Sequence, residues 1–276
     1  VVSTASYEAR KYGVHSAMPL AEAKRLCPDG IFMRGNYLHY AEVSREVRSV
    51  LDTVSPLVEM ASIDEAYVDV TGSQRIFGGD DGIARYVKSE VRKRTGVPCT
   101  VAITPNKLVA KIASNEGKPD GYVCIKAGEE AAYLRPLTIG KLPGIGPKTQ
   151  QSLEAKGFKT LGQLASLPSD EIVALLGPGG YALQRRARGE SSSVVVTEWV
   201  QKSIGRETTF ATDLLDWRRI EGILAYLTER TMHALRAKRM EARCVTLKVR
   251  YKDFSTYTFA KTLPVPTCVD RDVSEA

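Results

Sequence analysis

The feature that most constrains the fold is the order of amphipathic segments between residues 36 and 117. Asn36 can cap a helix whose apolar positions keep helical spacing up to Val54, and Pro56 ends it. The segments that follow are two strands, a helix, a strand and a short helix, over 56–60, 65–70, 80–96, 97–104 and 106–117. Up to residue 104 this order is a β-α-β-β-α-β ferredoxin-like unit without its opening strand, so we expect an α+β fold.

The rest of the chain differs from this unit in pattern. Residues 1–35 are irregular apart from a helix expected near 19–26, and residues 129–188 hold only short helices separated by Gly and Pro. A linker-like stretch then precedes a long helix over 216–238, two strands and the start of another helix. We therefore predict five parts, which are 1–35, 36–128, 129–190, a linker over 191–200, and 201–276.

The composition favours an anionic partner. The net charge is +7, and eight Lys or Arg residues but one acid lie between Arg230 and Lys252, although such a run can also be a solvated helix face. No apolar run reaches the roughly 18 residues of a membrane span and no signal peptide opens the chain, so we expect no membrane contact. The five cysteines are scattered and form no C-x-x-C, which favours a reducing cytoplasm. Because there are only three histidines, we expect any bound metal to be a hard cation with oxygen ligands.

Two adjacent acids, Asp64 and Glu65, lie in the segment ASIDEAYVDV, directly before a mostly apolar stretch. Neighbours in a regular strand point to opposite faces, but the turn of a hairpin near 61–64 can direct both carboxylates to one site. Adjacent carboxylates repel each other, and Mg²⁺ is commonly held by one or two carboxylates together with substrate phosphates. The pair therefore indicates a metal site, and an exposed turn rich in acids is the alternative.

Residues of the first segment can form a cradle for a polyphosphate. Thr4, Tyr7, Arg10 and Lys11 are closely spaced, and a guanidinium matches phosphate oxygens in a bidentate manner. Lys118 is a further candidate, because Gly and Pro on either side place it on a stiff loop. A plain surface helix and a solvated loop lysine are the alternatives.

The segment LPGIGPKTQQSLEAKG, residues 142–157, is typical of a helix-hairpin-helix turn. Its glycines allow close approach to a phosphate, and the amides at the start of the next helix point at an anion. Lys148 adds charge there. This pattern predicts contact with a nucleic-acid backbone without sequence preference.

These pieces and their order closely resemble the Y-family (translesion) DNA polymerases, most like the polymerase IV branch. The resemblance rests on five stretches, VVSTASYEARKYGVHSAMPLAEAKRLCP, SIDEAYVDVT, VAITPNKLVAKIASNEGKPDG, LPGIGPKT and KSIGRETTF. It implies a right-hand fold with fingers over 1–35, a ferredoxin-like palm over 36–128, a helical thumb over 129–190 and a little finger over 201–276. The expected function is low-fidelity, lesion-bypass DNA synthesis.

The resemblance also implies roles for single residues. Asp64 and Glu65 resemble the catalytic palm carboxylates that bind two Mg²⁺ ions. Thr4, Tyr7, Arg10 and Lys118 resemble the residues that hold the incoming triphosphate. Val1, Ser3 and Ala17 resemble the small roof over the nascent base pair. The residues expected to contact DNA are Gly144, Ile145, Gly146, Lys148, Lys202, Arg206, Arg239, Arg243, Lys248 and Arg250.

Partners and completeness follow from the same resemblance. We expect primer-template DNA and dNTPs as partners, a sliding clamp bound through a C-terminal tail, and a monomer in the bacterial cytoplasm at the nucleoid. The chain resembles a polymerase truncated at both ends, because the family's further metal-binding Asp and its ribonucleotide-excluding aromatic residue have no counterpart here. We therefore expect the chain as given to be inactive or nearly so.

Two other classes of protein remain as alternatives. A polymerase-like accessory subunit would bind DNA without catalysis, but the retention of SIDEA, Tyr7, Arg10 and Lys118 argues against it. A nucleotide cyclase on the same ferredoxin-like core would have no use for the helix-hairpin-helix segment or the basic run. DNA affinity that falls steeply with salt distinguishes a polymerase from a cyclase.

Overall fold

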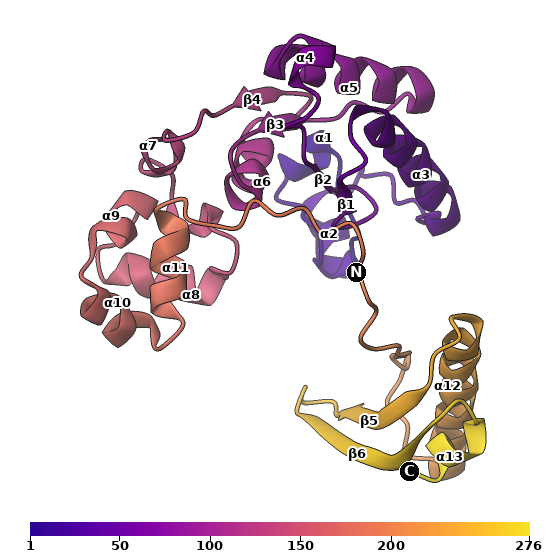
Figure 1. Ribbon diagram of the computed structural model, residues 1–276. Coiled ribbons are helices and arrows are strands. Elements are labelled where there is room, and N and C mark those ends of the chain that lie inside the picture. Colours follow the sequence, from indigo (N-terminus) through magenta and orange to yellow (C-terminus); the bar gives the residue numbers. More distant parts are fainter. The chain divides into compact units, whose positions relative to one another are not determined.

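The computed structural model describes residues 1–276 and divides them into two compact units, Val1–Glu198 and Trp199–Ala276. Figure 1 shows helices and strands in both units, so the predicted α+β composition is confirmed. The division between the units falls inside the stretch predicted as a linker. None of the helices has both the length and the apolar character that crossing a membrane requires.

The first segment holds two short helices around a small core of its own. They are α1 (Tyr7–Arg10) and α2 (Leu20–Leu26). The buried side chains between them are Val2, Val14, Met18 and Ala23. The predicted helix near 19–26 is therefore present.

The predicted palm begins with two long helices that share one core. They are α3 (Tyr37–Val54) and α5 (Asp80–Thr95), with the short α4 (Gln74–Phe77) before α5, and Figure 1 shows α3 and α5 side by side. The Asn36 side chain accepts a hydrogen bond from the His39 N–H at 3.2 Å, which caps α3 as expected. Apolar residues at helical spacing on both helices pack together, namely Val50, Leu51, Val54, Ile83, Val87 and Val91.

The palm strands form two separate pairs. Strands β1 (Val58–Met60) and β2 (Ala66–Val68) form the antiparallel hairpin that the sequence predicts. Strand β3 (Val101–Ile103) pairs in parallel with β4 (Tyr122–Cys124), a strand that we did not expect. Each pair makes a two-stranded sheet of its own.

Helix α6 (Lys107–Glu116) connects the palm to the next segment. Asn106 caps it by accepting the Val109 N–H at 3.1 Å. Its buried residues Leu108 and Ile112 belong to the same core as Leu153 and Leu164 of the predicted thumb. The thumb helices are α7 (Glu130–Leu134), the 3₁₀ turn η1 (Ile139–Lys141), α8 (Pro147–Ala155), α9 (Leu161–Ser166), α10 (Ser169–Leu176) and α11 (Gly180–Ala187).

The stretch after α11 contains no helix or strand between residues 190 and 216. It is nevertheless tied to the palm, since the Val196 N–H donates to Glu59 Oε2 at 2.7 Å.

The second unit is built around one helix and one hairpin. Helix α12 (Trp217–Ala237) is capped by Asp216, and strands β5 (Ala242–Arg250) and β6 (Thr256–Thr267) pair antiparallel before α13 (Asp270–Ser274). Met232 and Leu235 of α12 and Leu263 of β6 are buried. The long helix, the two strands and the final short helix match the predicted order.

Candidate active site

The turn of the β1–β2 hairpin holds both adjacent acids. The Glu65 carbonyl accepts the N–H groups of Ala61 at 2.9 Å and Ser62 at 3.1 Å. The Ser62 hydroxyl donates to Asp64 Oδ1 at 2.5 Å. The turn is thus closed by backbone and side-chain hydrogen bonds, which fix the position of an exposed Asp64 beside a half-buried Glu65.

Two lysines of α6 reach the same hairpin. Lys111 forms an ion pair with Glu65, and Lys107 Nζ lies 2.7 Å from Glu59 Oε2. Lysines four residues apart share one helix face, and Glu59 pairs across the strands with Tyr67 on one sheet face. Lys107 also lies 5.5 Å from the centre of the Tyr67 ring. The hairpin acids therefore face a row of cations.

This environment changes two pKa values. Burial alone would raise the pKa of Glu59, but the hydrogen bonds from Lys107 and from the Val196 N–H outweigh it and lower that pKa. Burial raises the pKa of the Tyr67 hydroxyl. Both shifts keep the charges of this face in one protonation state near neutral pH.

The hairpin turn offers two carboxylates to a hard cation. No group of three or more His, Cys, Asp or Glu side chains is placed to hold a metal ion. Asp64 and Glu65 can supply two carboxylates, which is the number that Mg²⁺ commonly takes when substrate phosphates complete its shell. The donor set therefore fits a metal that binds together with a nucleotide.

The structure brings two of the expected triphosphate ligands together. The Arg10 guanidinium carbon lies 5.9 Å from the centre of the Tyr7 ring, and Arg10 Nε donates to the Ala5 carbonyl at 3.0 Å. Tyr7 remains 52% exposed and Thr4 is exposed nearby in sequence. Lys118 lies on the loop between α6 and β4, and no hydrogen bond or ion pair joins it to the first segment.

The three residues expected to form the roof are brought together by backbone pairing. The Val2 N–H donates to the Met18 carbonyl at 2.9 Å, and the Ala17 N–H donates to the Val2 carbonyl at 2.8 Å. Val1 and Ser3 therefore flank the residue that pairs with Ala17. All three side chains are small or of moderate size and exposed.

The thumb carries the predicted hairpin turn before α8. Gly144 has φ +94°, a conformation that glycine adopts readily, while Ile145 is buried beneath the turn. Gly146 precedes α8, whose first residue is Pro147, and Lys148 is exposed on its first turn. Sequence reasoning missed Arg186 of α11, whose Nη1 lies 3.2 Å from the position that a Cβ on Gly144 would take.

The expected DNA contacts of the second unit come from three parts of the chain, namely β5, the residues after α12 and the stretch before α12. Lys248 and Arg250 lie on one face of the β5–β6 hairpin, where Lys248 pairs with Glu207 and Arg250 Nε donates to Thr256 Oγ1 at 2.9 Å. Arg243 stands at an irregularity in the register of β5. Arg239 follows α12 with φ +54°, and the remaining two, Lys202 and Arg206, lie on the extended stretch before α12.

Comparisons with known proteins agree with this arrangement. Residues 1–115 match the impB/mucB/samB family, residues 127–158 match the helix-hairpin-helix motif of that family, and residues 201–276 match its C-terminal domain. The DNA polymerase IV of Dehalococcoides mccartyi strain CBDB1 is 41% identical over 273 residues, which are 99% of this chain and 70% of that protein. The DNA polymerase IV of Methanoculleus marisnigri is 43% identical over 264 residues, which are 96% of this chain and 73% of that protein.

Solved structures similar to this chain are also Y-family DNA polymerases. A chimeric Y-family DNA polymerase based on Dbh has a TM-score of 0.84 at 26% identity, over 99% of this chain and 79% of that one. An insertion ternary complex of Dbh DNA polymerase has a TM-score of 0.66, also at 26% identity, over 99% of this chain and 80% of that one.

The helix-hairpin-helix turn, the match to the family models and the likeness to solved Y-family polymerases define a lesion-bypass DNA polymerase. The chain belongs to the impB/mucB/samB family of Y-family DNA polymerases, among the relatives named DNA polymerase IV. It is a DNA-directed DNA polymerase, and members of this family depend on a metal.

Proposed function

We propose that the chain adds dNTPs to the 3′ end of a primer on a template strand, with Asp64 and Glu65 as its metal-binding acids. The observation that carries this proposal is the closed turn of the β1–β2 hairpin, which presents two neighbouring carboxylates beside a helix that bears lysines. The family membership supplies the reaction class, and the ternary complex among the similar structures supports DNA and nucleotide as partners.

The metal is proposed to be Mg²⁺, as two ions. When bound, such ions lower the pKa of the primer hydroxyl and neutralise the triphosphate. Asp64 and Glu65 supply oxygen ligands, and Lys111 of α6 forms an ion pair with the Glu65 carboxylate. Arg10 and Tyr7, together with Thr4 and Lys118, bind the phosphates of the incoming nucleotide, where a guanidinium can make paired hydrogen bonds.

The roof and the grip on DNA complete the proposal. Val1, Ser3 and Ala17 leave room above the new base pair, which suits bulky template bases. The Gly144–Gly146 turn and Lys148 hold a DNA backbone phosphate from the thumb, and Arg186 adds a cation beside that turn. The resemblance to the family is our support for a sliding clamp as a further partner, a monomeric enzyme and a cytoplasmic place of work.

We also propose that the chain as given is inactive or nearly so. Only two carboxylates are placed to hold the ions, and no third His, Cys, Asp or Glu side chain joins them. Fewer protein ligands leave more of the coordination shell to water and phosphate, which weakens metal binding.

A segment exchange tests the assignment of the acids independently of the speed of this chain. The palm segment 36–128 would replace the corresponding segment of the Dehalococcoides polymerase, which is 41% identical to this chain. We expect the exchanged enzyme to extend a primer with Mg²⁺ and four dNTPs. Asp64→Asn or Glu65→Gln in the exchanged segment should lower the extension rate by at least about a hundredfold.

Two results would contradict the proposal. An exchanged enzyme that melts normally and binds primer-template DNA but never extends it favours the accessory-subunit alternative. Undiminished extension by the two acid variants assigns the metal to other residues. The unmodified Dehalococcoides polymerase and its thermal melting curve serve as the controls for activity and folding.

A further inference from the structure

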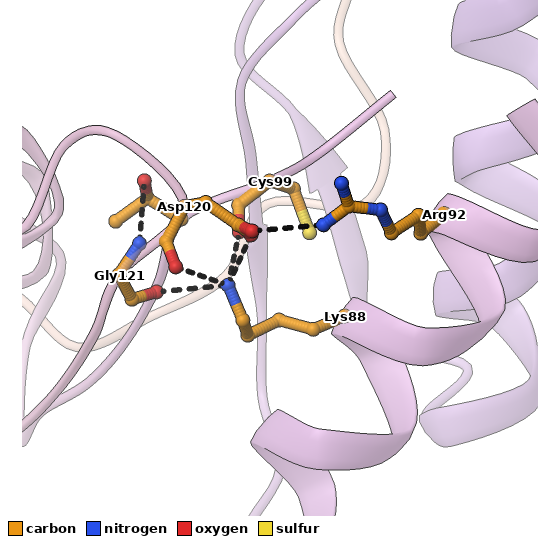
Figure 2. Close-up of polar contacts among 6 residues, drawn as sticks. Lys88, Arg92, Cys99, Asp120 and Gly121 are labelled. Carbon is orange, nitrogen blue, oxygen red and sulfur yellow. Dashed lines mark hydrogen bonds and ion pairs between the residues drawn. The ribbon is translucent and has the colours of Figure 1, made fainter. Parts of the chain in front are cut away.

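A single lysine of α5, Lys88, holds the loop between α6 and β4 by hydrogen bonds. Lys88 Nζ donates to the carbonyl of Cys99 at 2.8 Å, to the carbonyl of Asp120 at 2.7 Å and to Asp120 Oδ1 at 2.5 Å. The Gly121 carbonyl lies farther away, at 3.4 Å. Figure 2 shows the ammonium group between the end of the loop and the chain that enters β3, with Arg92 reaching Asp120 from the next turn of the helix.

The loop that Lys88 holds is short and tightly closed. A Cβ on Gly121 would stand 2.0 Å from the carbonyl oxygen of Gly117, so the two ends of the loop nearly touch. The Gly121 carbonyl also accepts the Val101 N–H at 3.1 Å, at the start of the β3–β4 pair. Lys118 lies inside this loop and is exposed, so its backbone is fixed while its side chain is free to reach a ligand.

Asp120 adopts a conformation that needs support. Its φ is +49°, in the left-handed region that residues other than glycine seldom occupy. Such a conformation persists when the surroundings determine it. Here Lys88 binds both the carbonyl and the carboxylate of Asp120, while Arg92 Nη1 lies 3.0 Å from Asp120 Oδ2. The Lys88 hydrogen bond, the strongest influence, lowers the pKa of Asp120, so the contact remains charged at neutral pH.

Lys88, which anchors this loop to α5, is itself held in a well-packed part of the helix. Val87 and Val91 of α5 are buried in the core shared with α3, on either side of Lys88 in sequence. The Lys88 side chain is only 24% exposed. The ammonium group has three N–H donors, and each can make one of the three short hydrogen bonds to the protein. No donor is therefore left for a substrate.

We propose that Lys88 is a positioning residue for nucleotide binding, because it fixes the loop that carries Lys118. This inference rests on the proposed role of Lys118 as a ligand of the incoming triphosphate. A charged hydrogen bond to a phosphate depends on its distance and angle, so freedom in the loop weakens the bond although Lys118 is still present. Lys88 thereby acts on the nucleotide without touching it.

The test measures dNTP affinity rather than turnover. The chain is bound to a primer-template whose primer ends in a dideoxynucleotide, and the matching dNTP is titrated with Mg²⁺ while a fluorescent template base reports binding. Lys88→Met keeps the length of the side chain and removes the ammonium, and we expect it to weaken dNTP binding about tenfold, the change that one lost charged hydrogen bond produces. Affinity for the primer-template alone should not change.

Matched variants make the result specific. Lys93→Met removes a lysine of the same helix that is 76% exposed and meets only Glu90, so it should leave dNTP affinity unchanged. Asp120→Asn keeps an acceptor and tolerates the left-handed conformation, so it should weaken binding only about threefold. This variant also serves if Lys88→Met does not fold, which thermal melting would reveal.

Comparison with Lys118→Ala separates this inference from the proposed function. Equal weakening by Lys88→Met and Lys118→Ala, with no further loss in the double variant, supports the inference. Weakening by Lys118→Ala alone overturns the role of Lys88 and keeps that of Lys118. Unchanged affinity in Lys118→Ala overturns the proposed role of Lys118, and with it the reason for the anchor.

Discussion

Lys111 of α6 forms an ion pair with Glu65, directly beside Asp64 in the turn of the β1–β2 hairpin. An ammonium next to a carboxylate that is proposed to bind a metal has two opposing effects. It offsets the repulsion between the adjacent acids before a metal binds, and it lowers the negative potential that attracts the metal. Both side chains are about one third exposed, so water screens part of this interaction.

Removing Lys111 should therefore strengthen metal binding. We expect Lys111→Met to raise the affinity for Mn²⁺, used as a spectroscopic substitute for Mg²⁺, by about fivefold, which corresponds to roughly 1 kcal/mol. Electron paramagnetic resonance of free Mn²⁺ measures this affinity. Lys107→Met is the matched control, because Lys107 pairs with Glu59 rather than with either acid of the turn. A lower affinity in Lys111→Met would show that the lysine mainly holds Glu65 in its binding position.

The thumb turn should be sensitive to a single methyl group. Gly144→Ala places a Cβ at φ +94° and 3.2 Å from Arg186 Nη1, so we expect a loss of about 1–2 kcal/mol in the free energy of unfolding. Urea denaturation measures it. Gly146→Ala is the control, since a Cβ at Gly146 meets nothing within 4 Å and φ there is −85°. Equal stability of the two variants would mean that the turn can relax.

The salt dependence of DNA binding should report how many phosphates the thumb contacts. We expect Lys148→Met and Arg186→Met each to weaken primer-template binding and to reduce the slope of log affinity against log salt by about one, because each removes one phosphate contact. Fluorescence anisotropy at several salt concentrations gives the slope. Lys93→Met, on the exposed face of α5, should leave it unchanged. A slope that stays the same in all three variants places the DNA backbone elsewhere.

The first residue of α5 should make stability depend on pH in acid. Lys126 Nζ lies 2.6 Å from Asp80 Oδ2 and Gln74 Nε2 donates to Asp80 Oδ1 at 2.6 Å, and these contacts hold the pKa of Asp80 below its usual 3.8. Since the folded pKa is lower than the unfolded one, the stabilisation is present above about pH 4 and is lost as the pH falls through the folded pKa.

Asp80→Asn should therefore cost about 1 kcal/mol at neutral pH, and this cost should shrink progressively as the pH falls below about 4. Thermal or urea unfolding of both proteins across this range is the measurement. Asp170→Asn is the control, because Asp170 also lies in the first turn of a helix but is exposed and has no side-chain partner. A difference between wild type and Asp80→Asn that does not shrink in acid would contradict the role of the charge.

The long elements could be predicted because their periodicity extends over several turns. The helix predicted over 80–96 is α5, Asp80–Thr95, and it ends at Gly96 with φ +72° as its sequence indicates. Strand β4 was missed, because three residues are too few to show alternation and its partner β3 lies beyond an intervening helix. The turn of the β1–β2 hairpin was predicted correctly, since an acidic and polar stretch separates two apolar ones.

Only some residues of the candidate site could be predicted from the sequence. Adjacent acids and a glycine-rich turn are local patterns, so Asp64, Glu65 and Gly144 could be selected directly. Lys111, Arg186 and Lys88 could not, because each gains its neighbour from a segment far away in the chain. Within their own helices these residues look like ordinary solvated cations, and only tertiary packing distinguishes them.

The most direct test of the central claim is the metal affinity of the two hairpin acids. Mn²⁺ would be titrated by electron paramagnetic resonance in the presence of dideoxy-terminated primer-template and the matching dNTP. We predict that Asp64→Asn and Glu65→Gln each bind the ion at least about tenfold more weakly than wild type. Asp69→Asn should bind it normally, because the Asp69 carboxylate accepts the Thr71 N–H within its own turn. Equal affinity in all four proteins would show that Asp64 and Glu65 are not the metal ligands.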